Sequence, residues 1–405
     1  MARSEPPRVN TLFEGRPSVV WKAARGSNVV DVDGNRYVDL TSGFGAAAVG
    51  HADPTVVDAI HRQSVELVHG LADVAAHPAR VELADRLCAL APLPNARVHF
   101  AVSGSDAVEI ALKTAQLATG RTGILCLEDA YHGVSIGALA VSSRDTFRRP
   151  FANVLRSNVH RVARGAPLDV VDDLLRAHGS ELGCVVFEPI AGREGVHLAP
   201  AGWLAELVQR SREAGALVVA DEIFTGFGRT GPAFAVELEG VTPDLVCVGK
   251  ALGGGLPIGA VLGSSDVMAA WDGPGEALHT GTFLAQPLAC AAALAVLDRL
   301  GDGLLDRVGT LGTRVAARLA ALESEEGIVE CRGRGLLWGI ELASAAITAR
   351  TIELTLADGL LLLASGPAGR VLELVPPYVI TDAQLDLSLD ILARSIDRAV
   401  AETTA

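Results

Sequence analysis

Short apolar runs alternate with amphipathic helical patterns over residues 55–300, and this alternation leaves the chain few possible folds. The clearest runs cover residues 97–102, 123–127, 184–187, 217–220 and 245–248. Strands that read as continuous apolar runs are buried on both faces, which is typical of parallel sheets with helices packed on either side. The pattern therefore predicts an α/β fold with a large domain built on a mostly parallel central sheet.

The flanking segments differ from this central pattern. Residues 29–39 read as a strand, an Asp-Gly-Asn turn and a returning strand. After residue 301 the sequence shows a long helix, a strand-rich stretch over residues 327–342 and a final helix from Asp382. A chain of 405 residues has room for two or three units. We predict an N-terminal segment (1–54) that packs with a smaller α+β domain (301–405), and a large domain (55–300) between them.

Acidic side chains outnumber basic ones, 48 to 34, which gives a formal net charge of -14. Such a field repels phosphate backbones and anionic lipids, which argues against nucleic-acid and membrane partners. The first ten residues carry no apolar signal core, and no apolar run approaches the ~20 residues of a membrane span. The six cysteines lie at least 38 residues apart, so we predict buried reduced thiols, no metal site and a cytoplasmic protein.

Lysine is rare in this chain. Among 34 lysines and arginines, only Lys22, Lys113 and Lys250 are lysines. Arginine can replace lysine as a surface charge, but it cannot form an imine because its guanidinium stays protonated. Lys250 lies at the carboxyl end of a predicted buried strand, where α/β folds place their chemistry. This position favours a nucleophilic Lys250 over a solvated loop lysine, whereas Lys113 is interpreted as a surface residue.

Two acids, Asp221 and Glu222, end the apolar run 217–220. A buried carboxylate needs a metal, a cation or a protonated ring nitrogen as partner, and the neighbouring sequence supplies no further metal ligands. A cationic cofactor nitrogen is therefore favoured. The glycines of residues 226–231 match GxGxxG, but Pro232 stands where a helix should continue and Asp244 precedes the next strand, which disfavours a dinucleotide site.

A small-residue turn at residues 103–106 joins a predicted strand to a predicted helix. Free N–H groups at a helix start bind phosphate, although simple capping by Ser105 is an alternative. Tyr131 follows another strand and can stack on a planar ring, or fill the core or surface as an ordinary tyrosine. Glu188 and Thr282 are polar residues that can likewise contact a cofactor, or serve as ordinary core or surface residues. An amine, a carboxylate, a phosphate cradle and an aromatic ring together match the needs of pyridoxal 5'-phosphate.

With these motifs the chain resembles the class III pyridoxal-phosphate-dependent aminotransferases of fold type I, which include ornithine, acetylornithine and 4-aminobutyrate aminotransferases. The similarity runs from about residue 29 to 380, and the family's motifs occur in order. They are Ser103-Gly104-Ser105-Asp106-Ala107, Tyr131-His132-Gly133, Glu188-Pro189-Ile190, Asp221-Glu222-Ile223 with the following glycines, Lys250-Ala251-Leu252-Gly253-Gly254-Gly255, and Thr282-Phe283.

The resemblance implies a role for each matching position. Lys250 would form the covalent imine with the cofactor and move the proton of the reaction, and Asp221 would keep the ring nitrogen protonated. Thr282 would reach the phosphate of the neighbouring subunit's cofactor, which implies a homodimer with shared active sites. The remaining implied cofactor contacts are Gly104 and Ser105 at the phosphate, Tyr131 and Ile223 on the two ring faces, and His132 and Glu188.

Departures from the family's pattern fall at the substrate pocket. Val134 stands where amino-acid-using relatives have an arginine. Arg193 and Glu373 stand where relatives carry a glutamate and an arginine that form a switchable ion pair. The charges are thus exchanged, and we expect Arg193 and Glu373 to face each other, the alternative being that both point to solvent. Phe224 replaces a glutamine that contacts the cofactor's phenolic oxygen in several relatives, and Phe44 matches an aromatic over the pocket.

The resemblance implies a transaminase that moves an amino group between an amino donor and a carbonyl acceptor in two half-reactions. The altered charges argue against ordinary ornithine or 4-aminobutyrate as substrate, and favour an amine, an amino sugar or a specialised biosynthetic intermediate. An aminomutase or racemase of the same fold would share every cofactor residue. A cofactor-free binding protein is the third possibility.

Overall fold

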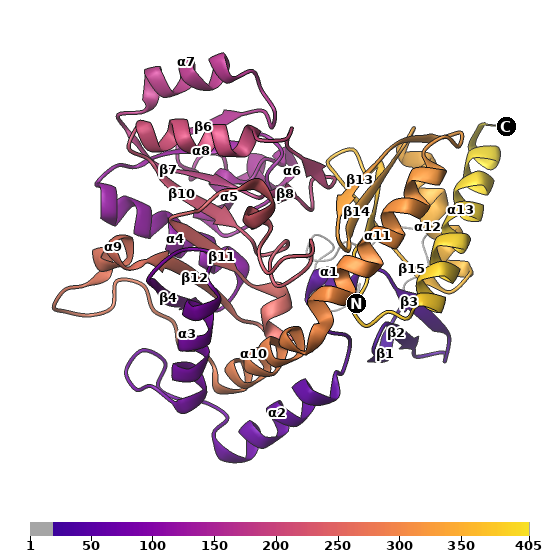
Figure 1. Cartoon of the computed structure of the whole chain (residues 1–405), viewed down its shortest axis with the longest axis horizontal. Helices are drawn as coiled ribbons and strands as arrows, with labels where there is room; N and C mark the ends of the chain where they lie inside the picture. Colours follow the sequence, from indigo (N-terminus) through magenta and orange to yellow (C-terminus); the bar gives the residue numbers. More distant parts are fainter. Residues whose placement is uncertain (1–18, 405) are drawn as a thin grey trace.

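A computed structural model describes residues 19–404 and places them in two units around separate sheets (Figure 1). The larger unit is built on a seven-stranded sheet in the order β4-β12-β11-β10-β7-β5-β6, and β12 alone runs antiparallel to its neighbours. This confirms an α/β fold with a mostly parallel central sheet. The strands are β4 (Ala96–Ala101), β12 (Gly259–Ser264), β11 (Leu245–Val248), β10 (Leu217–Asp221), β7 (Leu182–Phe187), β5 (Gly123–Leu127) and β6 (Val159–Val162).

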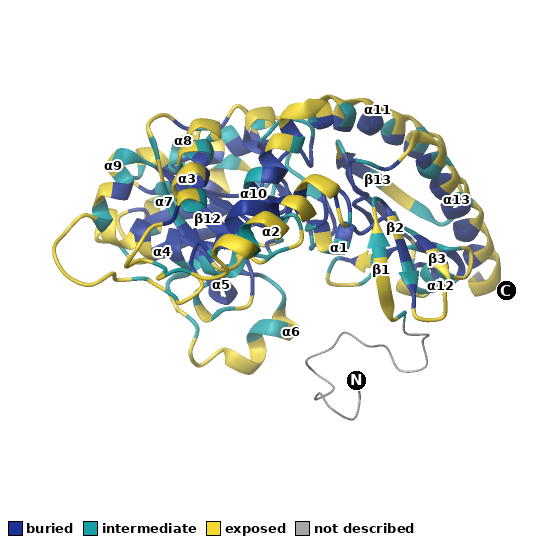
Figure 2. Ribbon diagram, turned by 90° about the horizontal axis from the view of Figure 1, so that it is seen from below, coloured by how far each residue is buried: buried dark blue, intermediate teal, exposed yellow. Residues whose placement is uncertain are grey.

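Helices cover both faces of this sheet because alternate strand residues point to opposite sides. In β10, Val218 and Ala220 join one apolar core, while Val219 joins the other. Figure 2 shows the strands and inner helix faces buried and the outer helix faces exposed. One face carries α4 (Gly104–Thr119), α5 (Ile136–Val141) and α9 (Ser265–Met268), and the other carries α2 (Pro54–Glu66), α3 (Pro78–Leu90), α7 (Leu168–His178), α8 (Trp203–Glu213) and α10 (Pro287–Arg299).

The smaller unit holds an antiparallel sheet in the order β13-β14-β17-β16, covered by three helices (Figure 1). Its first helix and its two strands over 328–342 follow the predicted pattern, and the last helix begins at Asp382 as predicted. Its elements are α11 (Leu305–Leu322), β13 (Ile328–Arg334), β14 (Leu337–Leu342), α12 (Ala345–Ala357), β16 (Leu363–Ser365), β17 (Val371–Leu374) and α13 (Asp382–Thr404).

The N-terminal strands join the smaller unit by backbone pairing. β1 (Trp21–Arg25), β2 (Asn28–Asp31) and β3 (Arg36–Asp39) form the predicted hairpin and its extension, and β3 pairs in parallel with β15 (Leu360–Leu361). The side chain of Asp31 closes the hairpin turn by accepting hydrogen bonds from the N–H groups of Asp33 and Asn35. The pairing supports the proposed grouping of segment 1–54 with residues 301–405, although residues 1–18 lie outside the described part.

The glycine-rich segment 226–231 joins the two units. Its Arg229 is buried, donates hydrogen bonds to the carbonyls of Leu336 and Pro376, and lies over the ring of Tyr378. A Cβ at Gly335 would come within 2.5 Å of the Thr230 carbonyl carbon, so the two backbones approach closely there. The GxGxxG match therefore reflects a contact between units, in line with the rejection of a dinucleotide site.

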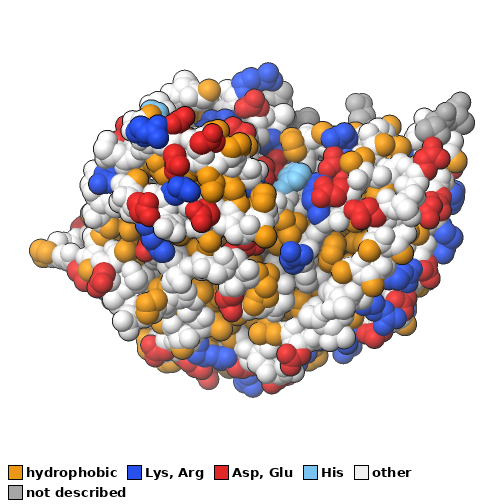
Figure 3. Space-filling model, turned by 45° about the horizontal axis from the view of Figure 1, so that its top comes forward, with side chains coloured by type: hydrophobic (Ala, Val, Ile, Leu, Met, Phe, Trp, Pro, Cys, Tyr) orange, Lys and Arg blue, Asp and Glu red, His pale blue; other side chains and the backbone are white. Residues whose placement is uncertain are grey.

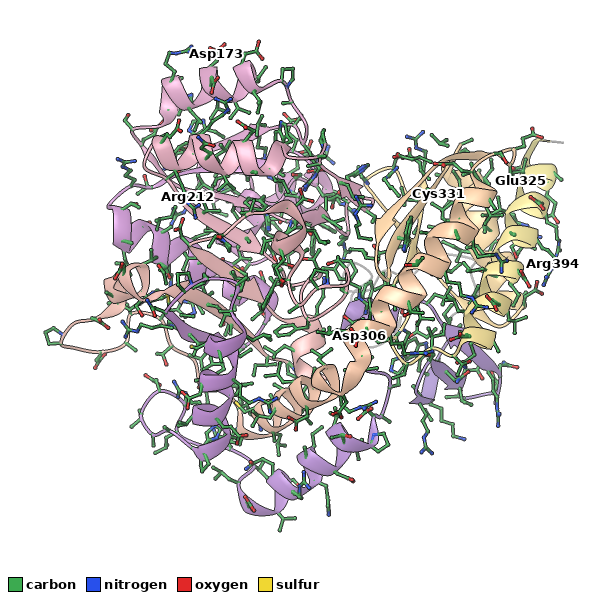
Figure 4. The ribbon with its side chains drawn as sticks, in the orientation of Figure 1. Asp173, Arg212, Asp306, Glu325, Cys331 and Arg394 are labelled. Atoms are coloured by element: carbon green, nitrogen blue, oxygen red, sulfur yellow. The ribbon has the colours of Figure 1, made fainter. Side chains whose placement is uncertain are left out.

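All six cysteines are free, but they are not all buried as predicted. Cys88 is only partly buried because it lies on the surface helix α3. Cys331 is only partly buried because it lies on the edge strand β13 (Figure 4). Within residues 19–404, no helix is both long and apolar enough to cross a bilayer. Figure 3 shows acidic and basic side chains interspersed on the visible face.

Candidate active site

Lys250 lies in a short 3-10 turn, η4 (Lys250–Gly253), directly after β11. Its φ of 42° is in the left-handed region, which strains a residue with a side chain. Its Nζ atom lies 3.7 Å from the centre of the Phe224 ring. Burial lowers the pKa of Lys250, although the carboxylates of Glu188, Asp221 and Glu373 oppose the shift. A lysine with a lowered pKa is more often neutral, the form that acts as a nucleophile.

Asp221 ends β10 and is buried against His132. The Nδ1 of His132 lies 2.6 Å from the Asp221 carboxylate, which also accepts a hydrogen bond from the Ile223 N–H. Burial lowers the pKa of His132, but the hydrogen bond and charge of Asp221 outweigh it, and the net pKa is raised. The structure thus assigns His132 to holding Asp221, a partner that the sequence interpretation missed because 89 residues separate the two.

Glu188 follows β7 and binds backbone groups on two sides. Its carboxylate accepts hydrogen bonds from the N–H groups of Tyr131 at 2.9 Å and Gly192 at 3.3 Å. Burial raises the pKa of Glu188 to about 7, against the opposing charge of His132. Arg164 donates to the Glu188 carbonyl and pairs with Asp129, which fixes this strand end. Glu188 therefore positions the segment that carries Tyr131.

The start of α4 (Gly104–Thr119) is the predicted phosphate cradle, and it has the free N–H groups that such a cradle needs. The first N–H groups of a helix have no intrahelical acceptor, and here they belong to Gly104 and Ser105. The cap is Ser103, which accepts from the Asp106 N–H, so the alternative in which Ser105 caps the helix is wrong. The Ser105 hydroxyl instead lies 2.7 Å from the hydroxyl of Ser135.

Close packing leaves no room for side chains around this cradle. A Cβ at Gly104 would come within 2.9 Å of Ile223, and one at Gly133 would clash with Ser105. Ile223 therefore lies beside Gly104 at the start of α4, and the Tyr131-His132-Gly133 segment reaches Ser105 through Gly133. The stacking roles of Ile223 and Tyr131 stay predictions. Ser103 and Ser135 were not singled out from the sequence, where only the Ser-Gly-Ser turn itself was a signal.

Arg193 and Glu373 lie near Lys250 but do not form the direct pair that was expected. Among the described residues no ion pair within 4.0 Å joins them, and the Arg193 guanidinium lies 4.6 Å from the ring centre of Tyr131. Arg193 is attracted to that ring and to Phe147, while Glu373 is held in the middle of β17. Both charges nevertheless act on Lys250.

Glu373 is buried, so it does not point to solvent either. Burial raises its pKa to about 7, although the positive charges of Lys250 and Arg193 oppose the rise. Lys250 is thus influenced by a carboxylate and a guanidinium that, within the described residues, no ion pair within 4.0 Å joins. Arg144, unnoticed in the sequence, supports Arg193 by donating to its carbonyl and pairing with Glu194 at 3.0 Å.

Phe224 lies against the same lysine, and Phe44 and Val134 are exposed residues of neighbouring turns. Phe224 packs so tightly that a Cβ at Gly45 would come within 2.6 Å of its ring. Phe44, in the turn α1 (Ser42–Gly45), is exposed next to this contact. Val134 is exposed beside the Ser105–Ser135 contact, near the start of α4. Its part in a substrate pocket remains a prediction.

Thr282 is exposed in a loop between α9 and α10. The same loop is tied to α4 through His279, whose ring nitrogens lie 3.0 Å from Asp106 and 2.9 Å from the amine of Lys113. Lys113 is exposed, as predicted for a surface residue, and it also helps to fix this loop. The predicted partner of Thr282 is the cofactor phosphate of the neighbouring subunit, so Thr282 is not expected to contact the site of its own chain.

Glu222, next to Asp221, gives a pH-dependent prediction. Thr225 and the Val236 N–H donate to its carboxylate, yet burial raises its pKa from 4.5 to about 7. The folded state then holds the proton more tightly than the unfolded state, so stability is lost as pH rises through this range. At about 1.4 kcal/mol per pKa unit, the loss is roughly 3 kcal/mol.

Glu222→Gln should remove this dependence, because glutamine keeps the shape without ionising. We expect the free energy of unfolding of the variant minus that of the wild type to increase by roughly 3 kcal/mol between about pH 5 and pH 8. Urea unfolding at several pH values measures this difference, and contributions from Glu188 and Glu373 cancel because both proteins contain them. A difference independent of pH would contradict the raised pKa of Glu222.

Comparison with known proteins agrees with this geometry. The family model described as aminotransferase class-III matches residues 13–396. The acetylornithine aminotransferase of Mycobacterium tuberculosis is 41% identical over 389 residues, covering 95% of this chain and 94% of the relative. That of Methanosarcina mazei is 35% identical over 382 residues, covering 94% and 92%.

The chain belongs to the class III aminotransferases. Solved structures of the family share its fold. A PLP-bound amine transaminase from an uncultivated Pseudomonas species has a TM-score of 0.90 at 28% identity, with 98% of both chains covered. The ornithine aminotransferase of Toxoplasma gondii has a TM-score of 0.88 at 27% identity, covering 98% of this chain and 94% of the other. This class III aminotransferase is therefore a pyridoxal-phosphate-dependent transaminase of fold type I, acting on an amino donor and a carbonyl acceptor.

The residues of this aminotransferase fit pyridoxal phosphate. The donor set is an amine at Lys250, a buried carboxylate at Asp221 and a helix start at Gly104 and Ser105. Gly104 and Gly133 stand at positions of this cradle where a Cβ would clash with Ile223 or Ser105, so only glycine fits there. These groups match the aldehyde, ring nitrogen and phosphate of the cofactor, respectively.

Proposed function

We propose that this aminotransferase takes an amine, an amino sugar or a specialised biosynthetic intermediate in place of ordinary ornithine or 4-aminobutyrate. The observation that carries the proposal is Glu373, a buried carboxylate near Lys250 with no ion pair within 4.0 Å in the described structure. A carboxylate attracts an ammonium group or accepts hydrogen bonds from hydroxyls, and it repels a substrate carboxylate. A substrate carboxylate would have to lie on the Arg193 side.

The chain's own residues support the chemistry in defined ways. When bound, the cofactor supplies a reactive aldehyde and an electron-accepting ring. Lys250 would hold it covalently, and its free amine would carry the proton between substrate and cofactor. Asp221, fixed by His132, holds a proton at the ring nitrogen. The N–H groups at Gly104 and Ser105 would bind the phosphate, and Tyr131 and Ile223 would enclose the ring.

A panel of amino donors tests the substrate proposal. Each donor is added alone to the purified enzyme, and loss of the cofactor's visible absorbance measures the first half-reaction. Amines and amino sugars should react with a higher kcat/KM than ornithine, acetylornithine or 4-aminobutyrate. If acetylornithine is the best donor, the substrate proposal is wrong and the aminotransferase assignment stands. Absorbance that returns without any carbonyl acceptor would instead indicate an aminomutase or racemase.

Reversing the two pocket charges tests whether they act together. Arg193→Glu should lower kcat/KM at least about tenfold, because it places a second carboxylate near Glu373. Adding Glu373→Arg should restore part of the activity, with a coupling free energy of about 1 kcal/mol or more. Arg25→Glu, an exposed change on β1, is the control and should leave kcat/KM unchanged. Purely additive effects of the two pocket changes would contradict the coupling.

We also propose a homodimer, based on an exposed apolar surface beside Thr282. Val74, Leu278 and Phe283 are 80%, 69% and 64% exposed. His69 contacts the Phe283 ring, so the loops at 67–76 and 278–286 form one surface. Exposed apolar patches of this kind are typical of protein interfaces.

We propose a reducing compartment such as the cytoplasm for this enzyme, because all six cysteines are free.

Phe283→Glu should break this dimer, because it places a charge in the apolar surface. We expect light scattering to report a monomer and kcat to fall at least about tenfold, since Thr282 then meets no partner. Val329→Glu, another exposed apolar residue but in the smaller unit, should leave both measurements unchanged. A wild-type monomer with full activity would contradict the dimer.

A further inference from the structure

Two histidines and a glutamate meet at the outer edge of the central sheet. His160 lies on the edge strand β6, His178 ends α7, and Glu181 precedes β7. One ligand atom from each, two ring nitrogens and a carboxylate oxygen, lie within 4.8 Å of one another. Figure 1 shows α7 and β6 at the top of the larger unit, away from the smaller unit, and Figure 4 labels Asp173 on the outer side of α7.

The three ligand atoms are arranged around the carboxylate. The Oε1 atom of Glu181 lies 2.8 Å from His178 Nδ1 and 3.4 Å from His160 Nε2. The two imidazole rings stack with centres 3.8 Å apart and planes at 25°. In a tetrahedral zinc site with bonds of about 2.0–2.1 Å, neighbouring ligand atoms lie about 3.3 Å apart. The two distances to the Glu181 oxygen bracket this spacing, and all three ligand atoms lie within 4.8 Å of one another.

One ligand atom of the cluster makes no well-formed hydrogen bond with the described protein groups. The hydrogen bond between His178 and Glu181 uses two of the three groups. His160 Nε2 is buried and has no hydrogen bond of acceptable geometry among the described residues. Its 3.4 Å approach to the Glu181 carboxylate is long, and a buried polar atom without a well-formed hydrogen bond is uncommon in native proteins. A cation placed between the three side chains would satisfy it.

The backbone that carries the three ligands is held firmly. The Glu181 N–H donates to the His178 carbonyl at 2.9 Å, and the Glu181 carbonyl accepts from Gly123 of β5. His160 of β6 pairs in register with Leu125 of β5. Rigid elements position ligands more accurately than loops do. The side chains of His160, His178 and Glu181 are 19%, 39% and 51% exposed, so an ion can enter and water can complete its coordination.

We propose that this cluster binds one divalent first-row transition-metal ion, with zinc as the best fit. His160 Nε2, His178 Nδ1 and a Glu181 carboxylate oxygen would be the protein ligands, and water would take the fourth position. Imidazole and carboxylate ligands suit zinc, cobalt or nickel, whereas magnesium and calcium prefer oxygen ligands alone. The ion would join β6, α7 and the start of β7, so it stabilises the fold and takes no part in transamination.

Zinc binding to the cofactor-loaded enzyme tests the site. After metal removal with a chelator and dialysis, calorimetric titration with zinc chloride should show one site per chain. His178→Ala, a change at a partly exposed residue, should weaken binding at least about tenfold, the lower bound for loss of even an outer-shell partner. His61→Ala, at an exposed histidine of α2, is the control and should bind like the wild type. The wild type and both variants carry the cofactor, so any zinc that the cofactor itself binds contributes equally to all three titrations.

Thermal unfolding gives a second readout that is independent of catalysis. Zinc should raise the unfolding temperature of the wild type and of His61→Ala, because a ligand that binds only the folded state stabilises it. It should not raise that of His178→Ala or Glu181→Gln, and magnesium should have no effect on any of them. No stoichiometric binding by the wild type, or equal zinc affinity in His178→Ala, would overturn the proposal.

Discussion

Lys250→Ala should reduce kcat by at least about 10⁴-fold, the largest effect of any single substitution in this chain. The variant loses the amine that attacks the cofactor, and with it the group that moves the proton, a function worth about 10²–10⁴-fold by itself. The surrounding structure favours this role, because burial lowers the pKa of Lys250 and keeps it nucleophilic. Steady-state assays with the best donor from the panel measure the loss.

A covalent readout separates catalysis from folding in this experiment. Borohydride reduction followed by mass spectrometry should find the reduced cofactor on Lys250 in the wild type and on no residue of the variant. Lys22→Ala, at an exposed lysine of β1, should keep both the covalent label and full activity. Retained turnover in Lys250→Ala, or a label on another residue of the wild type, would refute the assignment.

Asp221→Asn should lower kcat by about 10³-fold or more while preserving the shape of the side chain. The amide cannot hold a proton at the cofactor's ring nitrogen as a carboxylate does, so the ring becomes a weaker electron acceptor. The change also removes the charge next to His132, whose raised pKa depends on it. Proton NMR of the buried imidazole should therefore report a lower pKa for His132 in the variant.

Asp221→Ala is the harsher companion of this variant, and we expect a similar or larger loss of rate together with reduced stability. It leaves His132 buried without its 2.6 Å partner. Unpaired buried groups cost about 1–3 kcal/mol, which urea unfolding detects. Near wild-type kcat in Asp221→Asn would show that the carboxylate charge is not needed, and would contradict its role at the ring nitrogen.

The fold was largely predictable because its signals are local. The predicted boundaries of β5 and β11 agree with the observed ones, and the predicted boundaries of β10 agree to within one residue. β6 and β12 gave weaker signals. β12 contains two glycines, and the outer strand β6 is only partly buried, so neither reads as a clear apolar run.

The substrate side of the site was less predictable from the sequence. The exchange of charges at Arg193 and Glu373 was visible, but a direct pair did not form, because the guanidinium lies over the rings of Tyr131 and Phe147. The support of Asp221 by His132, and of Arg193 by Arg144, joins residues from different elements. Such contacts depend on distances that a linear pattern does not contain.

The sequence alone determined which residue types stand at the ends of buried strands, and hence that a single lysine, an acid and a glycine-serine turn could serve one cofactor. Periodicity and turn chemistry act within a few residues, so they can be read along the chain. The tertiary structure decided which of these groups touch, which stay unpaired, and how far burial moves their pKa values. Those properties arise from the desolvation and packing of residues distant in sequence, and they exist only once the sheet has formed.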